Sequence, residues 1–251
     1  MLRGSIIGLT LLLLMLTAPG VVWAAAGDSD DDGLTDSQEV IYHTDPTKSD
    51  TDADGYPDGE EVAKGYSPLF GGSKKMTQTD FDKDGLSDAL ELAFHTDLGK
   101  MDTDGDGQSD GDEVSHGLNP LDPANKPVVK TIEVHLKTQH LTYTMAGVKL
   151  GEATVSTGKK STPTPKGTFA VTGKDPRAWS KIAHLWMPYW MAFAGGGKFG
   201  LHELPEWPGG KKEGQNHLGT PVSGGCIRLG VGDAKKLYTW ASVGTKVTVL
   251  D

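Results

Sequence analysis

Cys226 is the only cysteine of this 251-residue chain, and it ends the glycine-rich stretch Ser223-Gly224-Gly225-Cys226. An isolated histidine, His202, lies upstream in Gly200-Leu201-His202-Glu203. A thiol without a disulfide partner in the chain and a histidine that can take its proton are the two groups that nucleophilic catalysis by cysteine requires. Most free cysteines are instead small buried apolar residues, so the residues around Cys226 must decide between the two interpretations.

A second kind of chemistry is indicated in the N-terminal half, where aspartates alternate with other residues. Four stretches repeat one pattern, with Asp at positions 1, 3, 5 and 9, Gly at position 6 and Glu at position 12. Alternating carboxylates, a glycine that permits a sharp bend and a closing glutamate form the oxygen-rich ligand set that Ca²⁺ prefers. The predicted ligands are Asp28, Asp30, Asp32, Asp36, Glu39, Asp50, Asp52, Asp54, Asp58, Glu61, Asp80, Asp82, Asp84, Asp88, Glu91, Asp102, Asp104, Asp106, Asp110 and Glu113.

The four loops form a duplicated pair. They start at residues 28, 50, 80 and 102, and a shift of 52 residues also aligns Leu34 with Leu86 and His43 with His95. These segments resemble EF-hand-like loops and the thrombospondin type 3 repeats of exported bacterial proteins, which implies up to four structural calcium ions. A disordered acidic linker is the alternative. It does not account for a glycine and a glutamate in register four times. The histidines lie outside the loops and are expected on helix surfaces or at helix ends.

Charge and composition divide the chain into parts. Residues 27–126 carry a net charge of −19 and residues 127–251 one of +8, which indicates two domains with different roles. Arg3, the apolar run 6–16 and small residues at 24–26 predict a cleaved signal peptide, hence export to the periplasm or cell wall without a membrane anchor after cleavage. The predicted domains are a signal peptide at 1–26, a four-loop module at 27–123, a linker at 124–128 and a catalytic domain at 129–251.

The C-terminal half is predicted to be mainly β. Apolar residues alternate with polar ones over 132–136 and 141–150, and further strands are indicated at 168–172 and 246–250. Asp233 is expected to cap a short helix that runs through Trp240. In the acidic half, the short apolar stretches after each loop are expected to form a turn or two of helix that pack in pairs.

Five motifs in order give this half a resemblance to a family. They are Val155-Ser156-Thr157-Gly158, Pro163 to Phe169, Pro188-Tyr189-Trp190-Met191, Gly200-Leu201-His202 and Leu218 to Leu229. Together they resemble the L,D-transpeptidase catalytic domain over nearly all of residues 129–250. The resemblance implies a β-sandwich-like fold with short helices that cross-links bacterial peptidoglycan through a cysteine. It implies no cofactor for catalysis.

The same resemblance implies roles for individual residues. Cys226 would attack the stem peptide, release its terminal D-alanine and pass the acyl group as a thioester to an amine of a second stem. His202 would move the proton, and the Glu203 carbonyl would orient the imidazole. Gly224, Gly225 and Ser223 are expected to form or support the oxyanion pocket, and Arg228, Trp190 and Tyr189 to bind substrate. His217 is a rival base, and Arg228 has the alternative of pairing with an acidic residue of the fold.

One departure from the family motif concerns Gly224, which stands where the family usually has histidine. The favoured function is the transpeptidase. An L,D-carboxypeptidase that uses water as the acceptor is an alternative, because groove shape decides the acceptor. Gly224 alone favours the other alternative, a catalytically weak calcium-dependent wall-binding or spacer protein. The expected partners are peptidoglycan stem peptides, calcium and anionic wall polymers. The positive C-terminal half contains no nucleic-acid recognition motif, so nucleic acid is not an expected partner.

Overall fold

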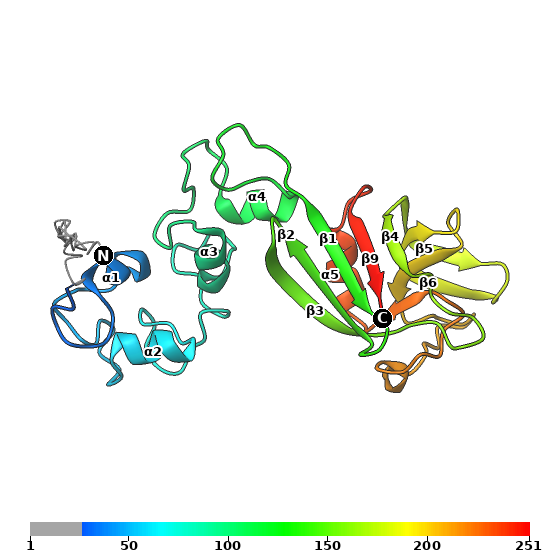
Figure 1. Cartoon of the computed structure of the whole chain (residues 1–251), viewed down its shortest axis with the longest axis horizontal. Helices are drawn as coiled ribbons and strands as arrows, with labels where there is room; N and C mark the ends of the chain where they lie inside the picture. The colour runs from blue at the N-terminus through cyan, green and yellow to red at the C-terminus, as the bar shows by residue number, and fades with distance from the viewer. Residues whose placement is uncertain (1–26) are drawn as a thin grey trace, which may run out of the picture.

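The computed structural model describes residues 27–251, which form an elongated molecule with an acidic helical part at one end and a β-rich part at the other (Figure 1). The predicted signal peptide at 1–26 lies outside the described residues. Within residues 27–251, none of the helices has the length and apolar character that crossing a bilayer requires.

Each acidic loop leads into one helix of seven residues, as predicted. The helices are α1 (Asp36–Tyr42), α2 (Asp58–Lys64), α3 (Asp88–Phe94) and α4 (Asp110–His116). The residue after each helix adopts a left-handed conformation, and His43 and His95 are two of these C-terminal caps. This confirms that the two histidines end helices.

The four loops share one backbone geometry. The glycine at position 6 has φ between +98° and +102° in every loop, a conformation that favours glycine. Its N–H donates to the position-1 aspartate, as from Gly33 to Asp28 Oδ2 at 3.1 Å. The two loops of a pair also touch: Gly59 N donates to Asp32 Oδ2 at 3.1 Å, and the equivalent Gly111 N donates to Asp84 Oδ2 at 2.5 Å. The first loop of each pair therefore packs on the start of the second helix.

The duplication continues beyond the helices. Met76 N donates to Gly65 O at 3.2 Å in the first pair, and Val128 N donates to Gly117 O at 2.9 Å in the second, again 52 residues later. Residues 124–128, predicted as a linker, are thus hydrogen-bonded back to the end of α4. Their hydrogen bonds complete the second pair, and the chain continues from them directly into the first strand.

Nine strands follow in one hydrogen-bonded sheet, in the order β4-β9-β1-β2-β3-β8-β7-β6-β5. They are β1 (Lys130–His135), β2 (His140–Met145), β3 (Val148–Ser156), β4 (Gly167–Ala170), β5 (Gly173–Ser180), β6 (Leu185–Ala194), β7 (Phe199–Glu203), β8 (Ile227–Leu229) and β9 (Lys246–Leu250). The pairs β1–β9 and β7–β8 are parallel and the others antiparallel. The short helices are η1 (Gln215–His217) and α5 (Asp233–Trp240). This confirms the mainly β fold class. One detail differs, because Gly232 precedes α5 as its cap and Asp233 is the first helical residue.

The sheet curls until its two edges approach each other. The edge strands β4 and β5 are joined by only two residues, and the Phe169 ring on β4 lies 5.4 Å from the Phe193 ring on β6. The main core fills the inside of this curl, and α5 contacts β6, β7 and β8. The layers of the predicted sandwich are therefore two halves of one continuous sheet.

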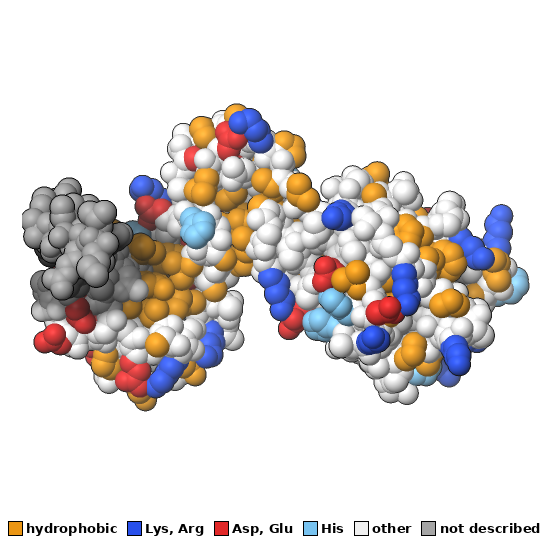
Figure 2. All heavy atoms as spheres, in the orientation of Figure 1, with side chains coloured by type: hydrophobic (Ala, Val, Ile, Leu, Met, Phe, Trp, Pro, Cys, Tyr) orange, Lys and Arg blue, Asp and Glu red, His pale blue; other side chains and the backbone are white. Residues whose placement is uncertain are grey.

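A second apolar cluster joins the repeats to the sheet. It combines α3 and α4 with the β2–β3 hairpin and α5, through the residues Leu86, Leu90, Phe94, Val114, Val128, Met145, Val148, Leu150 and Trp240. Figure 1 shows α3 and α4 next to β2 and β3, whereas α1 and α2 lie farther away. Figure 2 shows hydrophobic side chains gathered where α1 approaches α3, in a groove whose lining includes Val40, Ile41 and Leu92.

Candidate functional site

Two neighbouring strands bring the predicted nucleophile and base together. β7 and β8 run parallel, and their register pairs His202 with Arg228. Because paired residues of neighbouring strands project from the same face of a sheet, Arg228 lies on the face of His202, and Cys226 ends the turn that leads into β8. All three residues line one cavity of about 430 Å³.

His202 is held in one orientation. Its side chain is buried, and Nδ1 lies 2.6 Å from the Glu203 carbonyl oxygen. A carbonyl oxygen can only accept, so Nδ1 carries the hydrogen and Nε2 keeps its lone pair. Burial lowers the pKa of His202 to about 4, and the Arg228 charge adds to this, while the Glu203 carbonyl opposes it. At neutral pH the imidazole is therefore uncharged and able to accept a proton.

Like the imidazole, the Cys226 side chain is uncharged at neutral pH, because its thiol keeps the proton. Burial raises its pKa, although the Gly200 backbone and the Arg228 charge act in the opposite direction. The thiolate is the nucleophilic form of cysteine. A base must therefore take the proton during attack, and the free Nε2 of His202 belongs to the same cavity.

A tight turn holds Cys226 in place. The buried Ser223 hydroxyl donates to the Cys226 carbonyl at 2.6 Å and accepts the Gly225 N–H at 3.0 Å. Gly225 has φ +114°, and a Cβ there would lie 2.5 Å from the Phe199 ring, so only glycine fits. Ser223 therefore braces the turn. The Gly225 N–H, one of the predicted oxyanion donors, is already used inside the turn.

Gly224 lines the cavity and is unconstrained. Its φ lies outside the left-handed region, and a Cβ at this position would meet nothing within 4 Å. The backbone here does not require glycine. The departure from the family motif thus opens space beside Cys226 without altering the turn.

The Arg228 guanidinium is bound within the fold at one nitrogen and has no partner at another. Its Nη1 donates to both oxygens of Glu213, at 2.9 and 3.0 Å, which realises the alternative of an ion pair within the fold. Its Nε is buried and has no hydrogen-bond partner among residues 27–251. Glu213 also binds His217 Nδ1 at 2.9 Å, and His217 is not among the described residues that line the cavity. Of the two candidate bases, only His202 shares the cavity with the thiol.

The two predicted aromatic contacts face in different directions. Trp190 lines the cavity, lies against Gly200 and has its ring centroid 5.7 Å from that of His202. Tyr189 packs instead on Tyr238 of α5, with 5.7 Å between ring centroids. Tyr189 is not among the described residues that line the cavity and packs against the main core, which corrects the expected substrate contact.

The β5–β6 hairpin forms a wall of the cavity that the sequence reasoning missed. Trp179, Lys181 and Ile182 line the cavity from this hairpin, and Lys198 and Phe199 line it from the β6–β7 turn. Trp179 pairs with Trp186 across the hairpin, with 4.9 Å between ring centroids. Two tryptophans separated by six residues are the signal from which the hairpin could have been found.

The aspartates at positions 1, 3 and 5 form a cluster in every loop. Within each cluster, one carboxylate oxygen from each residue lies within 4.8 Å of the others. The clusters are Asp28, Asp30 and Asp32; Asp50, Asp52 and Asp54; Asp80, Asp82 and Asp84; and Asp102, Asp104 and Asp106. Position 12 adds a buried glutamate to each loop.

Two positions of each loop hold carboxylate oxygens without a partner among residues 27–251. Buried oxygens at positions 3 and 12 of every loop have no hydrogen-bond partner among residues 27–251. Burial, together with the loop aspartates, raises the pKa of Glu61 and Glu113 to about 7 and that of Glu91 to about 9. Burying unpaired carboxylates is costly, and a hard divalent cation offsets that cost. The residues present therefore fit calcium.

The aspartates at position 9 behave differently. Each is the first residue of its helix and accepts the N–H of the position-2 residue, as Asp58 does from Thr51 at 2.9 Å. Three of them also accept a hydroxyl, as Asp110 does from Thr103 Oγ1 at 2.6 Å. Asp36, Asp58, Asp88 and Asp110 lie outside the clusters of three, so in this structure they brace the loops.

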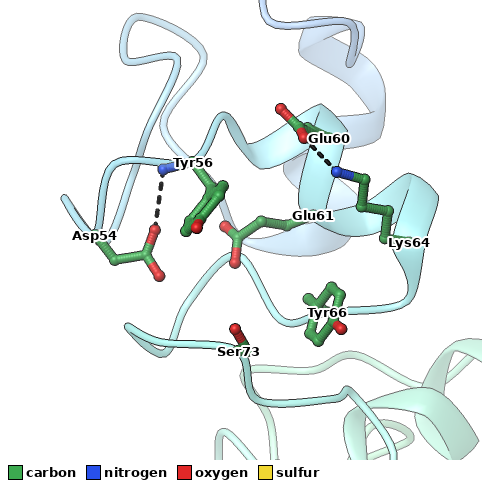
Figure 3. Close-up of a pocket in the computed structure, with 7 residues that line it drawn as sticks. All are labelled: Asp54, Tyr56, Glu60, Glu61, Lys64, Tyr66 and Ser73. Carbon is green, nitrogen blue, oxygen red and sulfur yellow. Dashed lines mark hydrogen bonds and ion pairs between the residues drawn. The ribbon is translucent and has the colours of Figure 1, made fainter.

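The second loop adjoins a hollow of about 230 Å³ (Figure 3). Asp54 and Glu61 reach into it from opposite sides, next to Tyr56. Glu60 also lines the hollow and pairs with Lys64. The position-5 and position-12 carboxylates thus converge on one space although they come from a loop and from a helix.

Both halves of the chain match family models of known proteins. Residues 129–249 match the family model of the L,D-transpeptidase catalytic domain. Residues 28–49, 50–65, 80–97 and 102–123 match the bacterial TSP3 repeat. Both predicted resemblances are confirmed, in the predicted order.

Individual relatives match about half of the chain. YciB of Bacillus subtilis, provisionally named an L,D-transpeptidase, is 33% identical over 130 residues, which are 47% of this chain and 64% of that protein. An L,D-transpeptidase from Mycobacterium smegmatis has 23% identity and a TM-score of 0.44, covering 51% of this chain and 61% of that one. One from Stackebrandtia nassauensis has 29% identity and a TM-score of 0.42, covering 49% and 56%. The chain thus spans less than two thirds of the length of each.

Proposed function

We propose, on the premise that residues 129–249 form an L,D-transpeptidase catalytic domain, that this chain is a peptidoglycan acyltransferase whose nucleophile is Cys226. The observation that carries the proposal is the shared cavity, which the thiol, the neutral His202 imidazole and Arg228 line together. The substrate is the amide between the third and fourth residues of a stem peptide.

The first half of the reaction forms a thioester. Cys226 Sγ attacks the scissile carbonyl carbon while His202 Nε2 takes the thiol proton. When the carbon–nitrogen bond breaks, the imidazolium returns that proton to the leaving amine, and D-alanine departs. The Glu203 carbonyl keeps the Nδ1 hydrogen in place and stabilises the transient imidazolium.

The second half transfers the acyl group. The side-chain amine of a diamino acid on a second stem attacks the thioester carbonyl, His202 accepts a proton from that amine, and the proton returns to the departing sulfur. A new amide links the two stems. We assign the oxyanion to the N–H groups of Gly224 and Cys226, because Ser223 already engages that of Gly225. The unpartnered Nε of Arg228 is available for a substrate carboxylate.

Defined stem tetrapeptides test this function by mass spectrometry. Cross-linked dimers and released D-alanine are expected, whereas trimmed monomers alone would make water the acceptor. Cys226→Ser should abolish both products, and His202→Gln should slow acylation by about 100-fold. His217→Gln is the matched control and should retain activity, because His217 lies outside the cavity. Folded protein that releases no D-alanine would contradict the assignment.

We also propose that the acidic module holds calcium. The residues that would hold the ions are the aspartates at positions 1, 3 and 5 and the glutamate at position 12 of each loop. Buried oxygens at positions 3 and 12 have no hydrogen-bond partner among residues 27–251. A bound ion supplies the positive charge that these carboxylates need for burial. The position-9 aspartates hold each loop to its helix, so the module is a rigid spacer.

Export follows as a proposal from the same assignment. A peptidoglycan cross-linker works outside the cytoplasm, and residues 1–26 have the pattern of a signal peptide. The test is secretion of the full chain and sequencing of the N-terminus of the mature protein. We expect cleavage near residue 26, and retention of the intact chain in the cytoplasm would contradict it.

A further inference from the structure

The candidate active-site cavity has one sign of charge. Of the described residues that line it, Lys181, Lys198 and Arg228 are basic, and none is an aspartate or a glutamate. The rest of the lining is largely apolar, with Trp179, Trp190 and Phe199 among it. A concave, partly apolar surface with cations and no anions raises the local concentration of negatively charged ligands.

The two lysines supply most of this charge. Glu213 engages Arg228 through both carboxylate oxygens, which offsets the guanidinium charge. Lys181 and Lys198 are exposed, and neither forms an ion pair with a carboxylate of residues 27–251. The only aromatic contact of a lysine ammonium at this cavity is that of Lys198, whose Nζ lies 5.4 Å from the Phe199 ring centroid. The lysines are therefore available to a ligand.

The two lysines come from different turns of the fold. Lys181 belongs to the turn between β5 and β6, and Lys198 to the turn between β6 and β7, so they flank β6 at its two ends. Gly195, Gly196 and Gly197 precede Lys198 with φ between +63° and +89°, which makes that turn sharp. Figure 2 shows lysine and arginine side chains around this end of the molecule. A peptide lying along β6 past Cys226 would meet a cation on either side of the thiol.

We infer that Lys181 and Lys198 are specificity-determining residues that select donor stem peptides by their free carboxylates. The inference rests on the proposed function for the identity of the donor. Stem peptides carry carboxylates that can be amidated, and amidation removes the negative charge while hardly changing the shape. The cavity should therefore favour the free acid over the amide of the same tetrapeptide.

A charge-matched pair of thiol reagents tests the field without requiring transpeptidation. Cys226, the chain's only cysteine, displaces iodide from iodoacetate or from neutral iodoacetamide, and intact mass gives both rates. Lys181→Gln/Lys198→Gln should lower the ratio of the iodoacetate rate to the iodoacetamide rate by roughly five- to tenfold, and each single variant by less. Lys246→Gln on β9 is the matched control and should leave the ratio unchanged. The shift should shrink in 1 M salt.

The donor preference is then measured with two tetrapeptides that differ only in amidation. Wild type should release D-alanine faster from the free acid by a similar factor, and the double variant should lose that preference. An unchanged reagent ratio in the double variant overturns the inference, as does a thiol that neither reagent reaches. Equal rates on the two tetrapeptides also overturn it. A shifted ratio with neither tetrapeptide processed refutes the proposed function and hence the donor identity, while the charge effect itself stands.

Discussion

The two repeat pairs contain the same loops but have different neighbours. In the second pair, Phe94 and Val114 are buried in the cluster shared with Met145 of β2. In the first pair, Val40 and Ile41 on α1 are 70% and 57% exposed. The loop motif therefore specifies the cluster of carboxylates, while the apolar residues that follow it determine what each pair packs against.

Because their neighbours differ, the two pairs should differ in how much they stabilise the catalytic half. The second pair continues into β1 through Val128, and Lys130 Nζ donates to the Trp240 carbonyl at 2.9 Å at the end of α5. The first pair meets the second through His43, whose Nε2 lies 2.7 Å from Asp97 Oδ1. Ordering of the second pair should therefore stabilise the catalytic sheet, and ordering of the first should not.

Calcium removal should have the largest effect and should reveal this asymmetry. With Kd of about 10⁻⁴ M, 10 mM calcium stabilises each loop by about 2.7 kcal/mol. Outside the predicted signal peptide every tryptophan lies in the C-terminal half, so tryptophan fluorescence reports thermal unfolding there. In calcium, Glu91→Gln should lower the Tm of this transition, and the equivalent Glu39→Gln should leave it nearly unchanged. A chelator should remove the difference. Equal shifts for the two variants would contradict the asymmetry, and a chelator without effect on any transition would contradict calcium binding.

Truncating the apolar contact comes next in size. Phe94 is 7% exposed, so Phe94→Ala should cost about 3–5 kcal/mol of unfolding free energy in the transition of the catalytic half. Tyr42, its equivalent in the first pair, is half-buried, and Tyr42→Ala should change that transition by less than about 1 kcal/mol. Urea unfolding followed by tryptophan fluorescence measures both. Similar costs for the two variants would show that the shared cluster does not connect the halves.

The asymmetry of the pairs is what the sequence did not predict. Four loops in register predicted the carboxylate clusters because the ligand geometry is local, within 12 residues. Helix ends were predictable for the same reason. Whether Phe94 packs within the repeats or against β2 depends on contacts between segments distant in sequence, and both arrangements satisfy the same apolar pattern.

The candidate active site likewise has a part that the sequence predicted and a part that it did not. Cys226 and His202 could be paired from motifs, and both line one cavity. Arg228 and Tyr189 could not be placed, because Glu213 comes from an irregular loop and Tyr238 from α5. Tyr189 has φ +57°, a local departure from strand geometry that the pattern of apolar residues does not report. Contacts made by irregular backbone were therefore the part that sequence reasoning missed.

Acid should destabilise the catalytic half independently of either pair. His202 has a pKa of about 4 in the folded state, against about 6.5 in the unfolded state. As the pH falls from 6.5 to 4, the unfolded chain binds a proton that the folded protein excludes. The stability contributed by neutral His202 is present above pH 6.5 and lost progressively towards pH 4, by about 3 kcal/mol. His202→Gln should flatten this dependence relative to wild type, and Cys226→Ser should keep it. Urea unfolding between pH 4 and 7 measures the difference. Parallel curves for His202→Gln and wild type would contradict the buried, neutral imidazole.

The smallest change in unfolding free energy should come from substituting two lysines, each at the end of one repeat pair. Lys130 lies across Gly117 at the end of α4 and reaches the Trp240 carbonyl, whereas Lys75 lies 3.7 Å from the Tyr66 ring centroid and donates to Lys64 O at 3.0 Å. Methionine keeps the apolar stem of either side chain and removes its donor. Lys130→Met should lower the unfolding free energy of the catalytic half by about 1 kcal/mol, because the α5 carbonyl loses its partner. Lys75→Met should lower only that of the first pair, whose contacts it closes. Circular dichroism at 222 nm together with tryptophan fluorescence separates the two parts during urea unfolding. If Lys75→Met shifts the fluorescence transition as much as Lys130→Met does, the first pair is coupled to the catalytic sheet as strongly as the second. The proposed asymmetry between the two pairs is then wrong.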